Sequence, residues 1–68
     1  MIKCHLSTLM GARKLKIVTL AKDIDVNRST ITALYYENAK EVNLGVIDKL
    51  CKYFNCQVSA LLEYQKKK

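Results

Sequence analysis

The residues best suited to chemistry lie in one short polar strip near the middle of the chain. If the segment that starts at Asn27 is a helix, Ile31 and Leu34 face inward, three residues apart. The outward positions are then Arg28, Ser29, Thr32, Ala33 and Tyr36. A guanidinium can donate two hydrogen bonds to guanine O6 and N7, and hydroxyl groups suit a base edge or a phosphate. The strip therefore predicts a face that reads DNA.

Two helices joined by a tight turn would position this strip. Leu20, Ala21 and Ile24 share one face of an expected helix over residues 17–24. Residues 25–27 form the turn, in which we expect Asp25 to have a positive φ. The side-chain carbonyl of Asn27 can accept a backbone N–H group and so begin the next helix, over residues 28–37. The small Ala21 would let the two helices approach closely.

Three further helices complete an all-α, compact five-helix fold. A first helix over residues 6–13 would bury Leu6, Leu9 and Met10, and a neighbouring backbone would explain Gly11. After a loop, Asn43 would cap a fourth helix, and Asn55 would end it in a left-handed conformation. The expected inward residues of that helix are Leu44, Ile47, Leu50, Cys51 and Phe54. Val58, Leu61 and Leu62 would drive a short fifth helix.

The two ends of the chain carry weaker signals. Ile2 and Cys4 alternate with polar residues, which is typical of a strand. A lone strand is not stable, so its partner would be the C-terminal segment or a second subunit, and a frayed terminus is the alternative. We therefore expect one domain over residues 1–68, with an extended segment at 1–5 and a basic disordered tail at 65–68.

Composition limits the classes of function. The chain has 68 residues and a formal net charge of +6, which favours an anionic partner such as nucleic acid, although a lysine tail supplies part of that charge. No apolar run is long enough to cross a membrane, and charged residues interrupt the N-terminal segment, unlike a signal peptide. We expect a soluble, cytoplasmic protein with no membrane partner.

Metal binding and catalysis find little support. The three cysteines, Cys4, Cys51 and Cys56, lack the spacing of a zinc site, and an odd number argues against a disulfide framework. The single histidine, His5, has no nucleophile or carboxylate at an interpretable spacing, and no glycine-rich phosphate loop is present. We expect no metal, no cofactor and no catalytic residues, so the protein is not expected to be an enzyme.

Both halves of the chain resemble the lambda repressor-like, Cro/C1-type (XRE) helix-turn-helix family. The first half of the match consists of Leu20, Ala21, Ile24, Asp25, Val26, Arg28, Ser29, Thr30, Ile31 and Leu34. The second half consists of Leu44, Ile47, Lys49, Leu50, Cys51, Phe54, Asn55, Cys56, Val58, Leu61 and Leu62. The resemblance covers residues 6 to 63 and implies that the third helix enters the major groove of double-stranded DNA.

The resemblance also implies which residues contact DNA. Tyr36 and the loop residues Asn38 and Lys40 would reach the phosphate backbone, and Lys16 stands where the second helix can hold a phosphate. The full set of expected DNA-binding residues is Lys16, Asn27, Arg28, Ser29, Thr32, Ala33, Tyr36, Asn38 and Lys40. Three positions depart from the pattern: Ile17 replaces a glutamine, Asp25 replaces the turn glycine, and Met10 with Tyr35 replaces an arginine–glutamate pair.

We expect a sequence-specific transcriptional regulator, a repressor that binds an operator as a homodimer. The fifth helix, together with the strand at Ile2 or with Tyr64, is the expected dimer surface. The alternative is an antitoxin, or another protein-interaction module of a toxin–antitoxin or phage/mobile-element system, with a partner protein. We expect this chain to be bacterial or phage-encoded, and to be associated with the nucleoid when it is bound to DNA.

Overall fold

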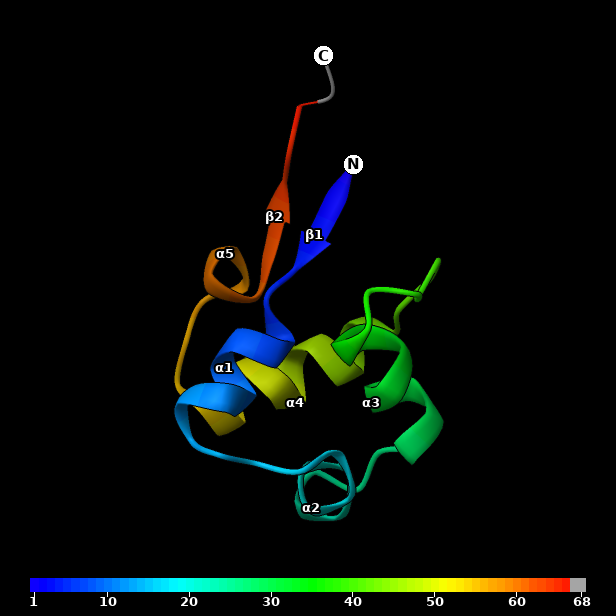
Figure 1. Ribbon diagram of the computed structural model, residues 1–68, viewed down its shortest axis with the longest axis vertical. Coiled ribbons are helices and arrows are strands. Elements are labelled where there is room, and N and C mark those ends of the chain that lie inside the picture. The colour runs from blue at the N-terminus through cyan, green and yellow to red at the C-terminus, as the bar shows by residue number, and fades with distance from the viewer. Residues whose placement is uncertain (67–68) are drawn as a thin grey trace.

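In the computed structural model, which describes residues 1–66, five helices pack together and a small two-stranded sheet projects from one end (Figure 1). The elements in chain order are β1 (Ile2–Cys4), α1 (Leu6–Ala12), α2 (Ile17–Asp23), α3 (Arg28–Tyr35), α4 (Leu44–Phe54), α5 (Val58–Leu61) and β2 (Leu62–Tyr64). The N-terminus and the end of β2 lie side by side at the far end of the sheet. The expected five-helix fold is confirmed, and the last two lysines of the expected tail lie outside the described residues.

The core takes apolar side chains from every helix. Its fully buried members are Leu6, Met10, Leu20, Ile31, Leu50 and Leu61. These residues follow the helical spacing that the sequence shows, because each amphipathic helix turns one apolar stripe inward. Leu9, expected to face inward, is partly buried at the edge of this core.

Two apolar residues and one glycine do not lie as the pattern predicts. Leu44 is 82% exposed, because it is the first residue of α4 and the buried side of that helix begins one turn later, at Ile47. Val58 holds the corresponding first position of α5 and is also exposed. A Cβ atom built on Gly11 would meet nothing within 4 Å, so the expected close approach of a backbone is wrong.

The strand at the N-terminus pairs with a second strand that the sequence did not reveal. β1 lies antiparallel to β2, with Ile2 opposite Tyr64 and Cys4 opposite Leu62. The C-terminal segment is therefore the strand's partner within the chain. Leu62 was expected in the fifth helix, but α5 ends at Leu61. Two adjacent leucines fit either structure, and only the non-local pairing with β1 selects the strand.

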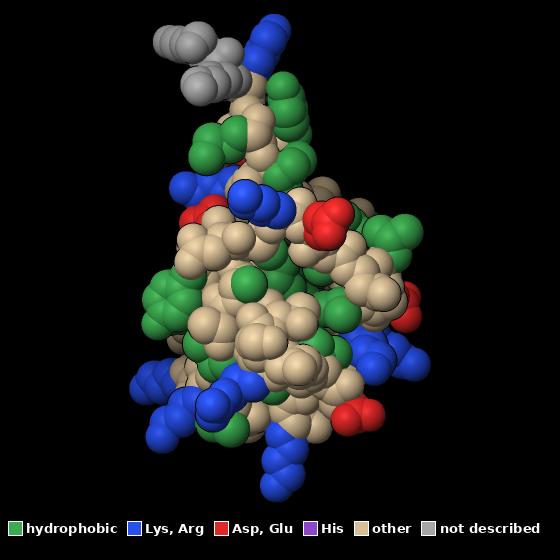
Figure 2. All heavy atoms as spheres, turned by 90° about the vertical axis from the view of Figure 1, so that its right-hand side faces the viewer, with side chains coloured by type: hydrophobic (Ala, Val, Ile, Leu, Met, Phe, Trp, Pro, Cys, Tyr) green, Lys and Arg blue, Asp and Glu red, His purple; other side chains and the backbone are tan. Residues whose placement is uncertain are grey.

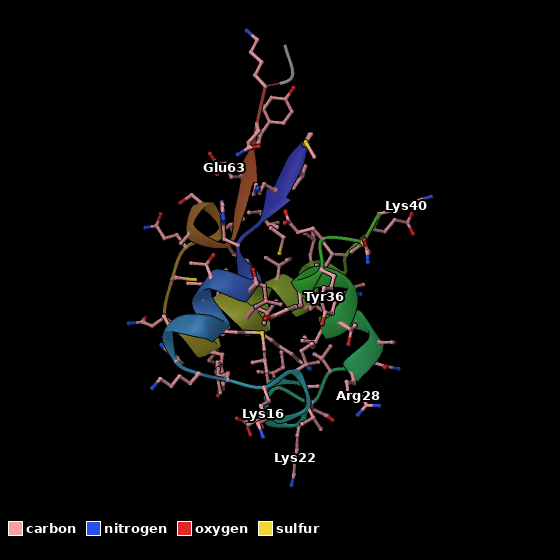
Figure 3. All side chains as sticks on the ribbon, viewed as in Figure 1. Lys16, Lys22, Arg28, Tyr36, Lys40 and Glu63 are labelled. Atoms are coloured by element: carbon pink, nitrogen blue, oxygen red, sulfur yellow. The ribbon has the colours of Figure 1, made fainter. Side chains whose placement is uncertain are left out.

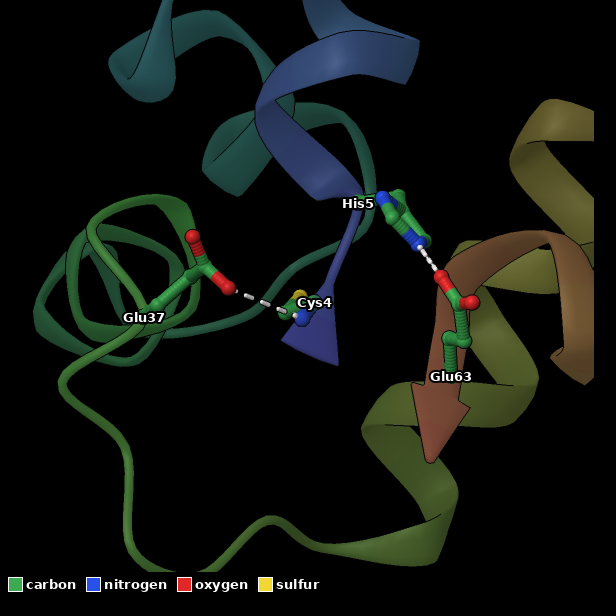
Figure 4. A network of polar contacts seen from close by, with 4 residues as sticks. All are labelled: Cys4, His5, Glu37 and Glu63. Atoms are coloured by element: carbon green, nitrogen blue, oxygen red, sulfur yellow. Dashed lines mark hydrogen bonds and ion pairs between the residues drawn. The ribbon is translucent and has the colours of Figure 1, made fainter. Parts of the chain in front are cut away.

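One side chain links β1 to the body, and another links the residue after β1 to β2 (Figure 4). The Cys4 N–H group donates to a carboxylate oxygen of Glu37 at 3.2 Å. On the other side, His5 Nε2 lies 2.7 Å from the carboxylate of Glu63 in β2. Glu37 follows α3 with a φ of 59°, and this left-handed turn brings its carboxylate to the strand. The sheet is thereby linked to the end of α3.

A tyrosine–aspartate hydrogen bond between α2 and α4 gives a prediction about pH. The Tyr53 hydroxyl donates to Asp23 Oδ2 at 2.9 Å, and this bond, with some desolvation, raises the pKa of Tyr53 above its usual value. A raised folded-state pKa stabilises the fold below the unfolded pKa of about 10, and the contribution is lost as pH rises through the folded pKa. Tyr53→Phe should therefore lower the urea midpoint at neutral pH, and the difference from the unchanged chain should vanish at high pH. If the urea midpoints of Tyr53→Phe and the unchanged chain differed by the same amount at neutral and at high pH, this prediction would be contradicted.

Candidate nucleic-acid interface

The turn between α2 and α3 is fixed by its own polar groups. Asn27 Oδ1 accepts hydrogen bonds from Ser29 N at 2.9 Å and from Ser29 Oγ at 2.8 Å, which confirms the expected N-cap. Asp25 has the expected positive φ, of 55°. The next residue, Val26, donates its N–H group to Ala21 O at 3.0 Å and closes the end of α2. These bonds hold the start of α3 at a set angle to α2.

Replacing the cap tests how strongly it holds α3. Asn27→Ala should reduce the free energy of unfolding by about 1 kcal/mol, because the Ser29 N–H group loses its acceptor. Asn27→Asp retains an acceptor oxygen and should cost much less. Urea unfolding followed by circular dichroism measures both changes. Equal losses for the two variants would show that the cap does not stabilise α3.

The outward side of α3 lies between two shallow surface hollows. The turn-side hollow is lined by Asn27, Arg28, Ser29, Thr32, Ala33 and Asn38. The α2-side hollow is lined by Leu15, Lys16, Ile17, Val18, Arg28, Thr32, Tyr35 and Tyr36. Arg28 and Thr32 line both, so they form the ridge between the hollows. Every residue expected to bind DNA lines one of them, except Lys40.

This side of the molecule has an uncharged centre with charged groups around it. Figure 2 looks onto the side that carries α3, where Lys and Arg side chains project around neutral atoms, interrupted by a few Asp and Glu. Arg28 is exposed at the start of α3 and extends away from the body (Figure 3). Within residues 1–66, no carboxylate lies within ion-pair distance of Arg28, since the ion pair found joins His5 and Glu63. Its guanidinium is free to bind a ligand.

The hydroxyl groups of Thr32 and Ser29 already use their protons. Thr32 Oγ1 donates to Arg28 O at 2.9 Å, and Ser29 Oγ donates to Asn27 Oδ1. The lone pairs of each hydroxyl oxygen stay exposed to solvent, where they can accept hydrogen bonds. In this arrangement both side chains suit an amino group, such as adenine N6 or cytosine N4, better than a phosphate oxygen.

Apolar atoms complete the α2-side hollow. Tyr36 is 62% exposed, and its ring meets the ring of Tyr35 edge to face at a centroid distance of 5.0 Å. Val18, at the start of α2, is also exposed to the hollow. The sequence reasoning did not select the Val18 side chain. Its position one residue after Ile17, off the buried stripe of α2, is the signal that could have revealed it.

Lys40 lies apart from the two hollows. It belongs to the loop between α3 and α4 and lines a different hollow, beside the sheet. Figure 3 shows Lys40 and Arg28 extending outward on the same side of the molecule. Lys40 and Arg28 can therefore contact the same ligand only if that ligand is long enough to span from the start of α3 to this loop.

The departures from the family pattern are accommodated by packing. Ile17 is partly buried against the core and offers no polar group at the start of α2. Met10 is fully buried, and Tyr35 is partly buried. Arg13, the residue after α1, packs against the end of α4: its guanidinium lies 5.0 Å from the Phe54 ring centroid and donates to Tyr53 O and Phe54 O at 3.4 Å.

The other reactive groups of the described residues do not converge. No cluster of three or more His, Cys, Asp or Glu within residues 1–66 could hold a metal ion. Desolvation raises the pKa of the Cys4 and Cys51 thiols, which favours their protonated, unreactive form. No helix within that part of the chain is long and apolar enough to span a membrane.

Two comparisons with known proteins bear on this interface. The model of a family described as the Cro/C1-type HTH DNA-binding domain matches residues 5–67. The chain is also similar to YozG of Bacillus subtilis (strain 168), described as an uncharacterized HTH-type transcriptional regulator. The two are 23% identical over 61 residues, which cover 90% of this chain and 73% of YozG.

Proposed function

This chain belongs to the Cro/C1-type helix-turn-helix family of DNA-binding domains, and from this premise we propose that it is a sequence-specific repressor that reads the major groove with α3. The observation that carries the proposal is the ridge of Arg28 and Thr32 between two hollows, with an unpaired guanidinium at its tip. A helix that presents such a ridge fits the width of the major groove.

Base reading would fall to four side chains of α3. Arg28 donates two parallel hydrogen bonds to guanine O6 and N7. Ser29 and Thr32 accept from an adenine or cytosine amino group, because their protons are engaged within the protein. Ala33 and the Thr32 methyl group contact a thymine methyl group. Together these contacts favour a short site that combines guanine with neighbouring amino-bearing bases.

Phosphate binding would orient the helix in the groove. Lys16 lies in the α2-side hollow, Asn38 in the turn-side hollow and Lys40 on the following loop, so cationic or amide groups flank α3. Tyr36 offers its hydroxyl group, and Asn27 offers its amide N–H groups, since its carbonyl oxygen serves the cap. These phosphate contacts carry no sequence information, but they fix the register and orientation of the protein on the duplex.

Repression follows if the operator overlaps a promoter, because the bound protein then excludes the polymerase. We further propose a homodimer, since a single domain of this size makes few base contacts and two recognition helices double the site. This would give a palindromic operator with half-sites about one helical turn apart, roughly 34 Å between centres.

Selection of bound duplexes from a random DNA pool tests the function. We expect a short palindromic motif with a guanine in each half. A reporter gene with that motif across its promoter should be repressed when the protein is expressed. Recovery of no motif, at a salt concentration where non-specific binding is weak, would overturn the proposal.

A further inference from the structure

We propose that the thiols of Cys51 and Cys56 form a two-coordinate binding site for Cu(I), a soft metal ion, at the end of α4. Neither cysteine lines the hollows beside α3, so the site is separate from the candidate DNA interface. The inference therefore goes beyond the proposed function and does not depend on it.

The backbone at the end of α4 brings the two cysteines together. Asn55 has a left-handed φ of 51°, and its N–H group donates to Lys52 O at 3.3 Å. The Cys56 N–H group donates to Cys51 O at 2.9 Å. These two bonds define a Schellman motif, in which the residues joined by the longer-range bond bring their side chains into contact. Cys51 and Cys56 hold those two positions, so thiols five residues apart in the sequence are neighbours in the fold.

The surroundings of the thiols agree with this contact. Burial is the first cause that raises the pKa of the Cys51 thiol, and its interaction with the Cys56 thiol is the next. Both side chains pack against the core but stay partly exposed, so an ion in solution can reach them. The third cysteine, Cys4, is buried in β1 and has no such neighbour in its own element.

The number of donors selects the kind of ion. Thiolates are soft ligands, which favour Cu(I) and zinc. A structural zinc site takes four protein ligands, and within residues 1–66 no third His, Cys, Asp or Glu joins the pair in a group that could hold a metal ion. Cu(I), in contrast, forms linear complexes with two sulfur ligands. The spacing that argues against a zinc site therefore does not argue against this one.

Binding exchanges two protons for one ion. Each thiol releases its S–H proton to water, and each sulfur uses an electron pair to bind the copper, which remains Cu(I). Because the metal displaces the protons, a thiol that is protonated when free still binds. The bound unit carries one negative charge.

The end of α4 is already arranged for such a unit. Arg13 lies beside it, with its guanidinium donating to Tyr53 O and Phe54 O at 3.4 Å. Its positive charge offsets the negative charge of the bound unit. The guanidinium also satisfies the last two carbonyls of the helix, while the Schellman bonds satisfy those of Cys51 and Lys52. The helix end therefore needs no rearrangement when the ion binds.

Competition with a chelator tests the site, with the third cysteine as the matched control. Under anaerobic, reducing conditions, the unchanged chain should keep one Cu(I) per chain against an equimolar amount of the chelator bicinchoninate. Cys51→Ala and Cys56→Ala should each bind Cu(I) about a hundredfold or more weakly, and Cys4→Ala should bind it as tightly as the unchanged chain. Equal losses in all three variants, or transfer of the ion from the unchanged chain to the chelator, overturns the inference.

A second pair of measurements covers the case in which a variant is less stable. Each protein is compared with itself, with and without Cu(I), by thermal unfolding followed by circular dichroism. The ion should raise the midpoint of the unchanged chain and of Cys4→Ala but not of Cys51→Ala, because the folded pair binds better than the unfolded chain. X-ray absorption at the copper edge should show two sulfur neighbours. An unshifted midpoint of the unchanged chain, or any other number of sulfur neighbours, overturns the inference.

Discussion

Arg28→Ala is expected to remove most of the preference of the protein for its operator. The guanidinium has no ion-pair partner among the described residues and stands at the tip of the ridge on α3, so its loss removes a bidentate contact with guanine. Such a contact contributes about 1–3 kcal/mol of discrimination, or about 5- to 150-fold in affinity at each half-site. Fluorescence anisotropy titrations of operator and scrambled duplexes measure this ratio.

The controls separate base reading from general basicity. Lys49→Ala removes a cation from α4, beside Tyr53 and away from the two hollows, and should leave the ratio unchanged. Removal of Lys66, Lys67 and Lys68 should weaken binding to both duplexes about equally and reduce the dependence on salt. If Arg28→Ala and Lys49→Ala gave the same ratio, the assignment of α3 as the recognition helix would be wrong.

Leu50→Ala is expected to unfold most of the protein. Leu50 is fully buried in the middle of α4, and truncation of such a leucine costs about 2–5 kcal/mol. A single core in a chain of this length rarely contributes more than about 3–5 kcal/mol of net stability, so the variant should have little or none left. Thermal unfolding followed by circular dichroism should show a greatly lowered midpoint or no cooperative transition.

Leu44→Ala is the matched control on the same helix. The sequence pattern makes both leucines inward-facing, but Leu44 is 82% exposed in the structure. Its truncation should change stability by about 0.5 kcal/mol or less. A large loss of stability in Leu44→Ala would show that Leu44 is buried, and would contradict the observation that the buried side of α4 begins at Ile47.

The sequence predicted the helical part of the fold because that part depends on local signals. Apolar spacing identified all five helices, and short polar side chains marked where two of them start, at Asn27 and Asn43. The spacing failed where a residue stands at the end of a helix, as Leu44 does, because periodicity does not show how far the core extends. It also failed at Leu62, since a strand three residues long is stabilised by a partner about 60 residues away in the chain.

The candidate interface was predicted as a set of residues but not as a geometry. Spacing on one helix was enough to group Arg28, Ser29 and Thr32. That the Ser29 and Thr32 protons are used within the protein depends on rotamers, which the sequence does not encode locally. The separation of Lys40 from the hollows depends on the path of a loop, and a non-local hydrogen bond joins Glu37, near the start of that loop, to β1.

The most direct test of the central claim combines a protein change with a DNA change. Replacement of the operator guanine by 7-deazaguanine removes only the N7 acceptor in the major groove. If Arg28 binds that atom, the modified duplex should bind the unchanged protein more weakly by about 1 kcal/mol or more, and Arg28→Ala should bind both duplexes equally. If the modification weakened both proteins to the same extent, Arg28 would not contact that base, and the proposed reading of the major groove by α3 would be contradicted.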